Sequence, residues 1–401
     1  MTPIYLDYAA STPLSKPVLE KMTQVMSDPM LQGNASSSSH QYGWRARDLI
    51  VESRKTVAEL IGCSHQDIVF TSNATESNNL VIRGVIEHAL NGKKDISKIH
   101  LVTSAIEHKS VLDVFKKYES KGASVTYLQP NAYGLITAKS VSDVLQKNTI
   151  LVSVMFINNE LGNINDVTSI ASTCFDFNID NKTTILFHTD ATQAIGRIPL
   201  SLENTCINYL TFSGHKIYGP KGIGAICFNS NGANKCKKTL FGGSQELGFK
   251  PGTQANHQIA GFAEACLFFT DDSRVQDVRI KYDNLRQHLL DELTKGKLDF
   301  SLNSNHDNSY PGIVNIYIPN IDSEMLMAMI PYVSISTGSA CNSRKEESSY
   351  VVNAINKSKG LEQTDNEGAN IRVSFGLDTT VGMVSFAAES ICEAVAKYKS
   401  I

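Results

Sequence analysis

Short apolar segments typical of strands alternate with segments of helical periodicity over the first two-thirds of this chain. Residues 149–158 (TILVSVMFIN) are nearly all apolar, and residues 183–190 and 207–213 are of the same kind. Strands of this composition are buried on both faces of a parallel sheet, and helices such as the one predicted over 75–90 form the crossovers between them. Seven strand-like segments precede residue 230. The sequence therefore predicts a large α/β domain around a mostly parallel, seven-stranded sheet.

The pattern changes in the last third of the chain. Long helical segments come first, and the strand-like segments 312–318 and 369–375 are then separated by further helices. This order predicts a smaller α+β domain. We expect residues 14–257 to form the large domain, and residues 1–13 together with 258–401 to form the small one.

Composition and charge limit what the chain can bind. With 401 residues it is long enough for two domains, and its net charge of −3 provides no basic field for direct contact with nucleic acid. No apolar run approaches the length of a membrane span, and the N-terminus lacks the pattern of a secretory signal. The eight cysteines include no C-x-x-C pair, so we expect no metal site and no disulfide framework. Free thiols fit a reducing, cytoplasmic location.

Polar and ionisable residues follow the predicted strands, at the ends where open parallel sheets bind their ligands. Each has an ordinary structural explanation on its own: Thr75 as a helix cap, His108 as a hydrogen-bonded core histidine, and Lys216 as a surface lysine. Their convergence at one edge of the sheet favours a ligand site instead. The residues of this set are Thr75, His108, Asn159, Asp190, Gln193, Ser213, His215 and Lys216.

A lysine, a carboxylate, a histidine and a phosphate cradle are together what pyridoxal phosphate requires. Lys216 would supply the amine for its aldehyde, and Asp190 would hold the proton of its ring nitrogen. His108 would stack on the ring, and Gln193 would reach its phenolic oxygen. The phosphate would lie beside two further residues, Ser213 and His215.

Seven motifs of the chain closely resemble those of the cysteine desulfurases, class V, fold-type I pyridoxal-phosphate enzymes of the IscS and NifS type. The resemblance spans nearly the whole chain, in the family's order. The motifs are YLDYAAST (5–12), TSNATESNNL (71–80), EHKSVLD (107–113), NNELG (158–162), DATQAIG (190–196), SGHKIYGPKGIGA (213–225) and STGSACNS (336–343). The resemblance implies a sulfurtransferase that converts L-cysteine to L-alanine and carries the sulfur as an enzyme persulfide.

The roles of the family's catalytic residues can be transferred to the matching positions. Lys216 resembles the Schiff-base lysine and proton shuttle, and Cys341 resembles the nucleophile that becomes the persulfide. Arg372 resembles the arginine that binds the substrate carboxylate, with Asn159 and Asn34 beside it. His108 resembles the stacking histidine, which also moves protons.

The resemblance also implies a set of cofactor ligands and a homodimer. Ala74, Thr75, Ser213 and His215 match residues at the cofactor phosphate. Thr253 resembles the threonine that reaches the phosphate from the neighbouring subunit, so the two active sites of a homodimer would be shared.

Cys341 lies among small residues, just before a charged segment. Small loop residues move easily and pack little, which suits a thiol that must meet first a substrate and then a sulfur-acceptor protein. The attacking species is the thiolate. We interpret the other seven cysteines as buried small hydrophobes.

Two other functions fit parts of the pattern: another class V enzyme, such as a selenocysteine lyase or an aminotransferase, and a non-catalytic scaffold. The chain also departs from the family, since Leu247 and Lys250 stand where arginines are usual and Ala35 where proline is common. The sequence does not choose the acceptor. Iron–sulfur cluster assembly, tRNA thiolation and DNA phosphorothioate modification are all open destinations for the sulfur.

Overall fold

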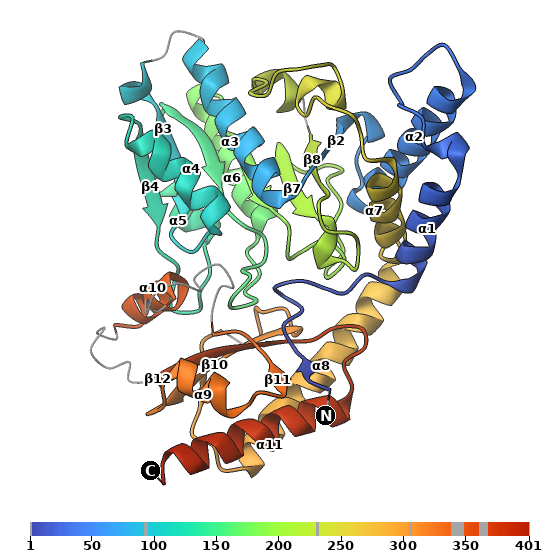
Figure 1. Cartoon of the computed structure of the whole chain (residues 1–401). Helices are drawn as coiled ribbons and strands as arrows, with labels where there is room; N and C mark the ends of the chain where they lie inside the picture. The colour runs from blue at the N-terminus through green and yellow to red at the C-terminus, as the bar shows by residue number, and fades with distance from the viewer. Residues whose placement is uncertain are drawn as a thin grey trace.

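The chain forms an upper, larger part built on one sheet and a lower, smaller part in which both termini lie (Figure 1). The structure is a computed structural model that describes residues 2–91, 95–229, 232–304, 307–337, 349–360 and 368–400. Cys341, the predicted nucleophile, lies outside the described residues.

Seven strands form the sheet of the upper part, in the order β2-β8-β7-β6-β5-β3-β4. β8 is antiparallel to both of its neighbours, and the other neighbouring pairs are parallel. This confirms the predicted fold class, an α/β domain around a mostly parallel, seven-stranded sheet. The strands are β2 (Ile68–Thr71), β3 (His100–Ser104), β4 (Ser124–Leu128), β5 (Thr149–Ser153), β6 (Leu186–Asp190), β7 (Tyr209–Ser213) and β8 (Gly224–Phe228).

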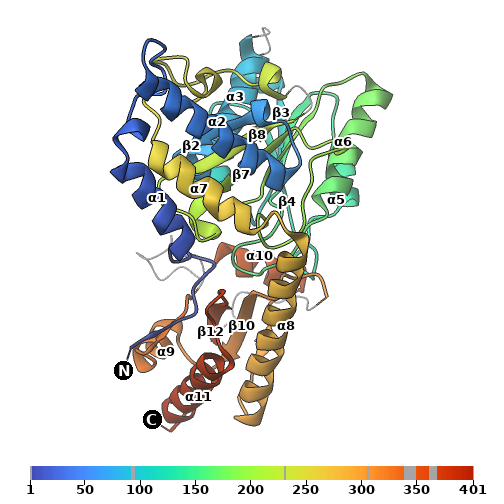
Figure 2. The same ribbon diagram turned by 90° about the vertical axis from the view of Figure 1, so that its right-hand side faces the viewer.

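Both faces of this sheet are buried, because successive side chains of a strand point to opposite faces. In β3, Leu101 and Val102 belong to different apolar clusters, and in β8 Ile226 and Cys227 divide in the same way. α3 and α4 supply the helical residues of one cluster, and α2, α6 and α7 contribute to the other (Figures 1 and 2). The helices of the upper part are α1 (Lys16–Ser27), α2 (Gln41–Ile61), α3 (Ala74–Asn91), α4 (Lys109–Glu119), α5 (Ala138–Ser142), α6 (Val167–Asn181) and α7 (Asn256–Phe268).

β5 is shorter than the strand predicted over 149–158, because it ends at Ser153. The apolar residues that follow, Val154 to Ile157, are buried in a loop rather than in the sheet. Backbone N–H groups of this loop donate to the carbonyl oxygens of His188 and Asp190 on β6. The loop therefore continues the apolar composition of the strand while turning the chain across the end of the sheet.

The lower part contains a three-stranded antiparallel sheet in the order β12-β10-β9. The N-terminal segment joins it, because β1 pairs with β11 in parallel and Asp7 forms a bridge with Ser374. The elements are β1 (Ile4–Tyr5), α8 (Asp272–Lys295), β9 (Ser301–Leu302), β10 (Ile313–Pro319), α9 (Ser323–Met329), β11 (Val333–Ser334), α10 (Tyr350–Ser358), β12 (Gly368–Ser374) and α11 (Val381–Tyr398).

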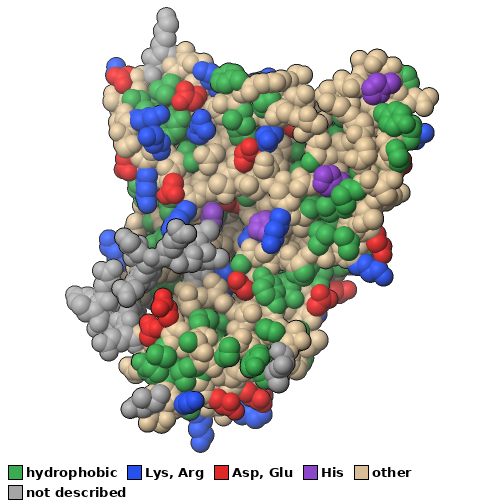
Figure 3. Space-filling model, viewed as in Figure 1, with side chains coloured by type: hydrophobic (Ala, Val, Ile, Leu, Met, Phe, Trp, Pro, Cys, Tyr) green, Lys and Arg blue, Asp and Glu red, His purple; other side chains and the backbone are tan. Residues whose placement is uncertain are grey.

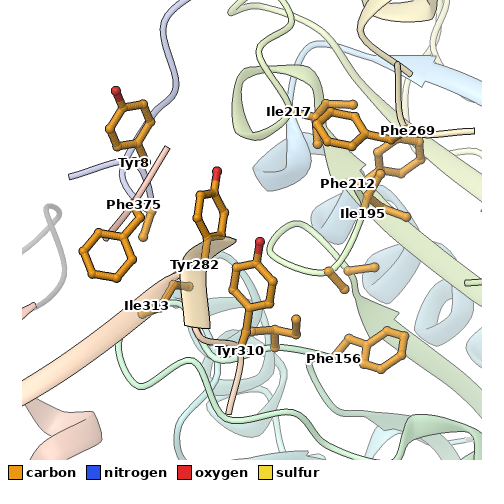
Figure 4. Packing of buried hydrophobic residues seen from close by; sticks show 14 of the residues in the cluster. Tyr8, Phe156, Ile195, Phe212, Ile217, Phe269, Tyr282, Tyr310, Ile313 and Phe375 are labelled. Atoms are coloured by element: carbon orange, nitrogen blue, oxygen red, sulfur yellow. The ribbon is translucent and has the colours of Figure 1, made fainter. Parts of the chain in front are cut away.

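One apolar core joins the two parts. Tyr8, Tyr282 and Phe375 of the lower part belong to the same cluster as Ile195 and Phe212 of the upper part (Figure 4). The rings of Tyr282 and Phe375 are 6.3 Å apart, centre to centre.

Short 3-10 helices lie in the connections between these elements. They are η1 (Pro29–Leu31), η2 (His65–Asp67), η3 (Ile96–Lys98), η4 (Gly214–Lys216), η5 (Gly232–Lys235) and η6 (Glu246–Gly248).

The domain boundaries before residue 14 and after residue 257 stay predictions. α7 begins at the second of these boundaries and packs against α1 and α2 of the upper part. In the part of the chain that the structure describes, no helix has both the length and the apolar character that a membrane crossing requires.

Candidate active site

A cavity of about 250 Å³ opens where the upper and lower parts meet, at the ends of β5, β6 and β7. Figure 3 shows histidine and basic side chains gathered at this level in the middle of the molecule's face. Nine of the residues that the sequence assigned to the site line the cavity: Ala74, Thr75, His108, Asn159, Asp190, Gln193, His215, Lys216 and Arg372. The predicted convergence of these residues is therefore visible in the structure, whereas their individual roles stay predictions.

Asp190 is the last residue of β6 and is buried. Its Oδ1 accepts a hydrogen bond from the backbone N–H of Thr192 at 2.9 Å, and its Oδ2 accepts one from Asn78 at 2.8 Å. Two donors of this kind fix the orientation of the carboxylate. The carboxylate is thus ready to hold a proton on a ligand's ring nitrogen.

Asn78 was not found by the sequence analysis. It is fully buried on α3, and its amide also donates to the Ser110 hydroxyl while its carbonyl accepts from the Thr211 hydroxyl at 2.5 Å. Two signals could have found it: it lies within the motif 71–80, and it follows Ala74 by one helical turn on the same face.

Lys216 ends η4, directly after β7. Its Nζ donates to the backbone carbonyl oxygens of Ala9 and Ala10, each at 2.6 Å. Burial, and then the positive charges of Arg197 and Arg372, lower the pKa of Lys216 to about 7. A large fraction of this lysine is therefore the neutral amine at neutral pH, which is the form that attacks an aldehyde.

His108 is the N-cap of α4. Its Nδ1 accepts from the backbone N–H of Ser110 at 3.1 Å, so the proton of the neutral ring is on Nε2. Burial lowers the pKa of His108, with the nearby positive charge of Lys216 acting in the same direction. The ring is fixed at the cavity wall, where it could stack on the ring of a ligand.

Arg372 comes from β12, so the lower part completes the cavity. It is only 1% exposed, and its guanidinium donates to the carbonyl oxygen of Asn159 at 2.8 Å and to Asp7 Oδ1 at 2.6 Å. Its Nε has no hydrogen-bond partner among the described residues. Asp7 is a second residue that the sequence analysis missed, because 365 positions separate it from Arg372.

One end of the cavity has the features of a phosphate site. Ala74 and Thr75 lie in the first turn of α3, where backbone N–H groups lack partners within the helix and attract anions. His215 lines the same cavity, and burial, together with the charge of Lys216, lowers its pKa to about 4. Its ring is therefore neutral at pH 7 and carries one N–H donor.

Three further predicted residues, Ser213, Asn34 and Thr253, do not line the cavity. Ser213 is buried and its hydroxyl donates to the carbonyl oxygen of Ile223 at 3.2 Å. Asn34 and Thr253 are exposed on the surface of the single chain. Cys341 lies outside the described residues, so the structure does not place it. Within the described residues, no group of three or more His, Cys, Asp or Glu side chains is arranged to hold a metal ion.

The donor set fits pyridoxal phosphate. An amine of lowered pKa, an oriented carboxylate, a neutral histidine and a helix N-terminus line one cavity. Gln193 adds a buried oxygen, Oε1, that has no hydrogen-bond partner within the described residues and belongs to the same wall. A buried oxygen of this kind is costly unless a ligand supplies its partner.

Comparison with known proteins identifies the family. Residues 4–385 match the model of the family described as "Aminotransferase class-V". The cysteine desulfurase IscS of Shewanella sp. (strain MR-4) is 38% identical over 404 residues, which cover 100% of this chain and 94% of the relative.

Solved structures give the same result. A structure titled "NIFS-LIKE PROTEIN" has a TM-score of 0.86 at 29% identity, covering 98% of this chain and all of that one. A structure titled "SspA in complex with cysteine" has a TM-score of 0.77 at 34% identity, covering 93% of this chain and 98% of that one. The enzymes of this family depend on pyridoxal phosphate, which agrees with the donor set in the cavity. The chain belongs to the class-V aminotransferase family and, within it, to the cysteine desulfurases of the IscS and NifS type.

Proposed function

We propose that this chain takes the sulfur atom of L-cysteine, leaves L-alanine, and holds the sulfur as a persulfide on Cys341. The observation that carries the proposal is the single cavity that contains Lys216, Asp190 and Arg372, an amine, a carboxylate and a guanidinium drawn from both parts of the chain. The full-length similarity to cysteine desulfurases favours this reaction over that of a selenocysteine lyase or an aminotransferase.

The substrate is held by its carboxylate. Arg372 presents a buried guanidinium to the cavity, and guanidinium groups bind carboxylates with paired hydrogen bonds. The backbone carbonyl of Asn159 accepts a hydrogen bond from the guanidinium of Arg372. Asn34 is exposed in the single chain and would assist only from a neighbouring subunit or after a local movement.

The cofactor supplies an electron sink that weakens bonds at the substrate's Cα and Cβ atoms. The neutral Nζ of Lys216 is the group that accepts and returns the proton at Cα. Asp190 would hold the proton on the ring nitrogen, His108 would stack on the ring, and Gln193 would reach its phenolic oxygen. Ala74, Thr75 and His215 would hold the phosphate, and the sequence analysis adds Ser213 to this set.

The sulfur atom of the substrate is transferred to the sulfur atom of Cys341. The thiolate of Cys341 attacks the substrate sulfur, the S–S bond forms, and the substrate Cβ–S bond breaks. The electron pair of that bond passes to the carbon skeleton, which takes up a proton and leaves as alanine. The overall change is cysteine plus enzyme thiol to alanine plus enzyme persulfide, and a protein thiol then accepts the outer sulfur.

A homodimer is part of this proposal. Two large apolar side chains, Phe241 and Leu247, are 88% and 51% exposed on the segment that leads to Thr253. Gln245 of the same segment donates to the Ser36 hydroxyl at 3.2 Å, which ties it to the loop before α2. A partner subunit on this surface would cover the apolar side chains and bring Thr253 to its own cofactor phosphate.

The test is the Cys341→Ser variant. We expect it to keep the cofactor's visible absorbance and the adduct formed with borohydride through Lys216, but to lose the persulfide in intact-protein mass spectrometry. Sulfide release from L-cysteine that survives this substitution would contradict the proposal. Transfer of labelled sulfur from cysteine to a captured protein then identifies the acceptor and hence the pathway.

A further inference from the structure

Helix α10 begins nine residues after Cys341 in the sequence and lies where the upper and lower parts meet (Figure 1). Its N-cap residue, Ser349, bonds to Glu160, and its first residue, Tyr350, bonds to Glu107. Glu160 directly follows the site residue Asn159. Glu107 directly precedes the site residue His108.

The hydroxyl of Ser349 has its full set of partners. It donates to Glu160 Oε2 at 2.5 Å and accepts from the backbone N–H groups of Val351 and Val352 at 3.2 and 3.3 Å. A serine hydroxyl has one donor and two acceptor sites, so the three bonds leave it a single orientation. The first turn of α10 is therefore fixed to the loop after β5.

Tyr350 fixes the same turn to the neighbouring loop. Its hydroxyl donates to the backbone carbonyl of Glu107 at 2.6 Å. The carboxyl group of Glu107 accepts from the backbone N–H of Met155 at 2.8 Å, and Asn158 donates to the carbonyl of Ile106 at 2.9 Å. The loops after β3 and β5 are thus joined to each other and to α10.

Apolar contacts also join α10 to the loops after β3 and β5. Ile106 and Leu161 from the two loops pack with Val351, Ala354 and Ile355 of α10 in a small, buried cluster of their own. This cluster is separate from the two clusters that cover the faces of the sheet.

Both carboxyl groups are held in the interior. Glu107 and Glu160 are 0% exposed, and burial raises the pKa of each. One oxygen of each has no hydrogen-bond partner within the described residues. Burying such groups costs free energy, so apolar packing alone would stabilise the position of the helix at a lower cost. Directional bonds fix orientation, which apolar contacts do not.

We propose that Ser349 and Tyr350 are positioning residues for desulfuration. Their bonds to Glu160 and to the Glu107 carbonyl fix the chain just after the Cys341 segment, on the same two loops that carry Asn159 and His108. Ser349 and Tyr350 then keep a constant position relative to the cavity, and this position limits how the thiol can approach the substrate. This inference rests on the proposed persulfide role of Cys341.

The test compares persulfide formation with substrate binding in the cofactor-loaded enzyme. Ser349→Ala and Tyr350→Phe each remove one hydroxyl, and Ser349→Thr retains it as the conservative rescue. Tyr118→Phe is the matched control, because Tyr118 donates to the carboxylate of Glu87 at 3.0 Å and does not line the cavity. Rapid mixing with saturating L-cysteine gives the persulfide by quench and mass spectrometry, and the change in cofactor absorbance gives binding.

We expect Ser349→Ala and Tyr350→Phe to slow persulfide formation about ten- to a hundredfold, the cost of a small misplacement of reacting groups. In these two variants, the cysteine concentration that half-saturates the absorbance change should stay within twofold of that of the unmodified enzyme. In Ser349→Thr and Tyr118→Phe, both this concentration and the rate of persulfide formation should stay within twofold. The inference is overturned if the two hydroxyl deletions stay within twofold of the unmodified enzyme, or if they weaken binding and slow transfer equally. If Ser349→Ala does not fold, Tyr350→Phe decides alone, since it keeps the ring.

A failure of the proposed function gives a different signature. The unmodified enzyme would then form no persulfide on Cys341 at all, before any variant is compared. That result would remove the basis of this inference as well.

Discussion

At the scale of single residues, the cavity separates its ionisable groups by their environment. Lys216 and His215 are neighbours in sequence, and burial disfavours the charged form of both. Lys216 is left with a pKa of about 7 and His215 with one of about 4. At pH 7 the chain therefore offers a partly neutral amine beside a fully neutral imidazole.

The lowered pKa of Lys216 predicts how the cofactor is captured. Only the neutral amine attacks an aldehyde, so the rate of pyridoxal phosphate uptake by cofactor-free protein should rise with pH through about 7 and level off above it. Stopped-flow absorbance between pH 6 and pH 9 measures this rate, with Lys216→Ala as the control that forms no adduct. A rate that still climbs about tenfold per pH unit near pH 9 would indicate an ordinary lysine.

The residues that sequence reasoning missed share one physical property. Asp7 and Asn78 lie within the motifs 5–12 and 71–80, which gave neither of them a role, and they act through their partners, Arg372 and Asp190. Their partners are known only once the chain is folded, since Asp7 lies 365 positions from Arg372. Asp190 and Lys216 could be predicted because Asp190 ends β6 and Lys216 lies three residues after the end of β7, and the ends of parallel strands meet.

At the scale of elements, the segment around η6 is anchored by one buried carboxylate, that of Glu246. Glu246 is buried with a positive φ of 49°, and its carboxylate receives Arg54 through two bonds of 2.7 Å. The same carboxylate accepts the backbone N–H of Phe70 at 2.7 Å. Leu247 and Lys250, which replace the usual arginines, lie on this anchored segment, and Lys250 reaches Glu76 at 3.7 Å.

The Arg54–Glu246 pair should be a principal stabilising contact of this segment. Arg54→Met leaves the carboxylate of Glu246, which is 2% exposed, without its cation. We expect the free energy of unfolding to fall by about 3 kcal/mol, as for other buried pairs that lose one partner. Denaturant unfolding of the cofactor-loaded protein measures the change.

The adjacent residue provides the control for that substitution. Lys55 pairs with Glu52 at 2.7 Å, but the side chains are 50% and 69% exposed. Lys55→Met should therefore change the free energy of unfolding by less than about 0.5 kcal/mol. Equal decreases in the free energy of unfolding of the two variants would show that burial of the Arg54–Glu246 pair does not increase its contribution to stability.

Elements with a strong pattern were predictable, and loops were not. The apolar run 149–158 placed β5 correctly at its start but extended it past Ser153, because buried loop residues have the composition of a strand. The helix predicted over 75–90 agrees with α3 to within one residue at each end. Ser213 ends β7 as predicted, yet its hydroxyl turns to Ile223, which strand-end position alone does not reveal.

At the scale of the whole molecule, the exposed apolar side chains near Thr253 point to assembly. Phe241 and Leu247 are too exposed to stabilise the single chain. Tyr42 and Trp44, at the start of α2, are also 48% and 44% exposed. Covering such side chains between two copies of the chain would favour a closed, two-fold dimer.

Introducing charge on this surface should separate the subunits. We expect Phe241→Glu and Leu247→Glu to shift the mass in light scattering from dimer toward monomer, and to weaken retention of the cofactor during gel filtration. Tyr133→Glu, at a tyrosine that is 58% exposed elsewhere, should change neither property. A dimer that persists in both variants would place the interface on another surface.

The N-terminal segment has a consequence for biosynthesis. Its carbonyl oxygens at Ala9 and Ala10 receive Lys216, while Asp7 is fixed by Arg372 and by a bridge to Ser374. Asp7 is therefore synthesised 365 positions before Arg372, and it has no native partner there until β12 has been made. A nascent or prematurely terminated chain cannot complete the wall around its reactive lysine. We therefore expect a chain that is cut before β12 to take up pyridoxal phosphate less well than the chain that includes it.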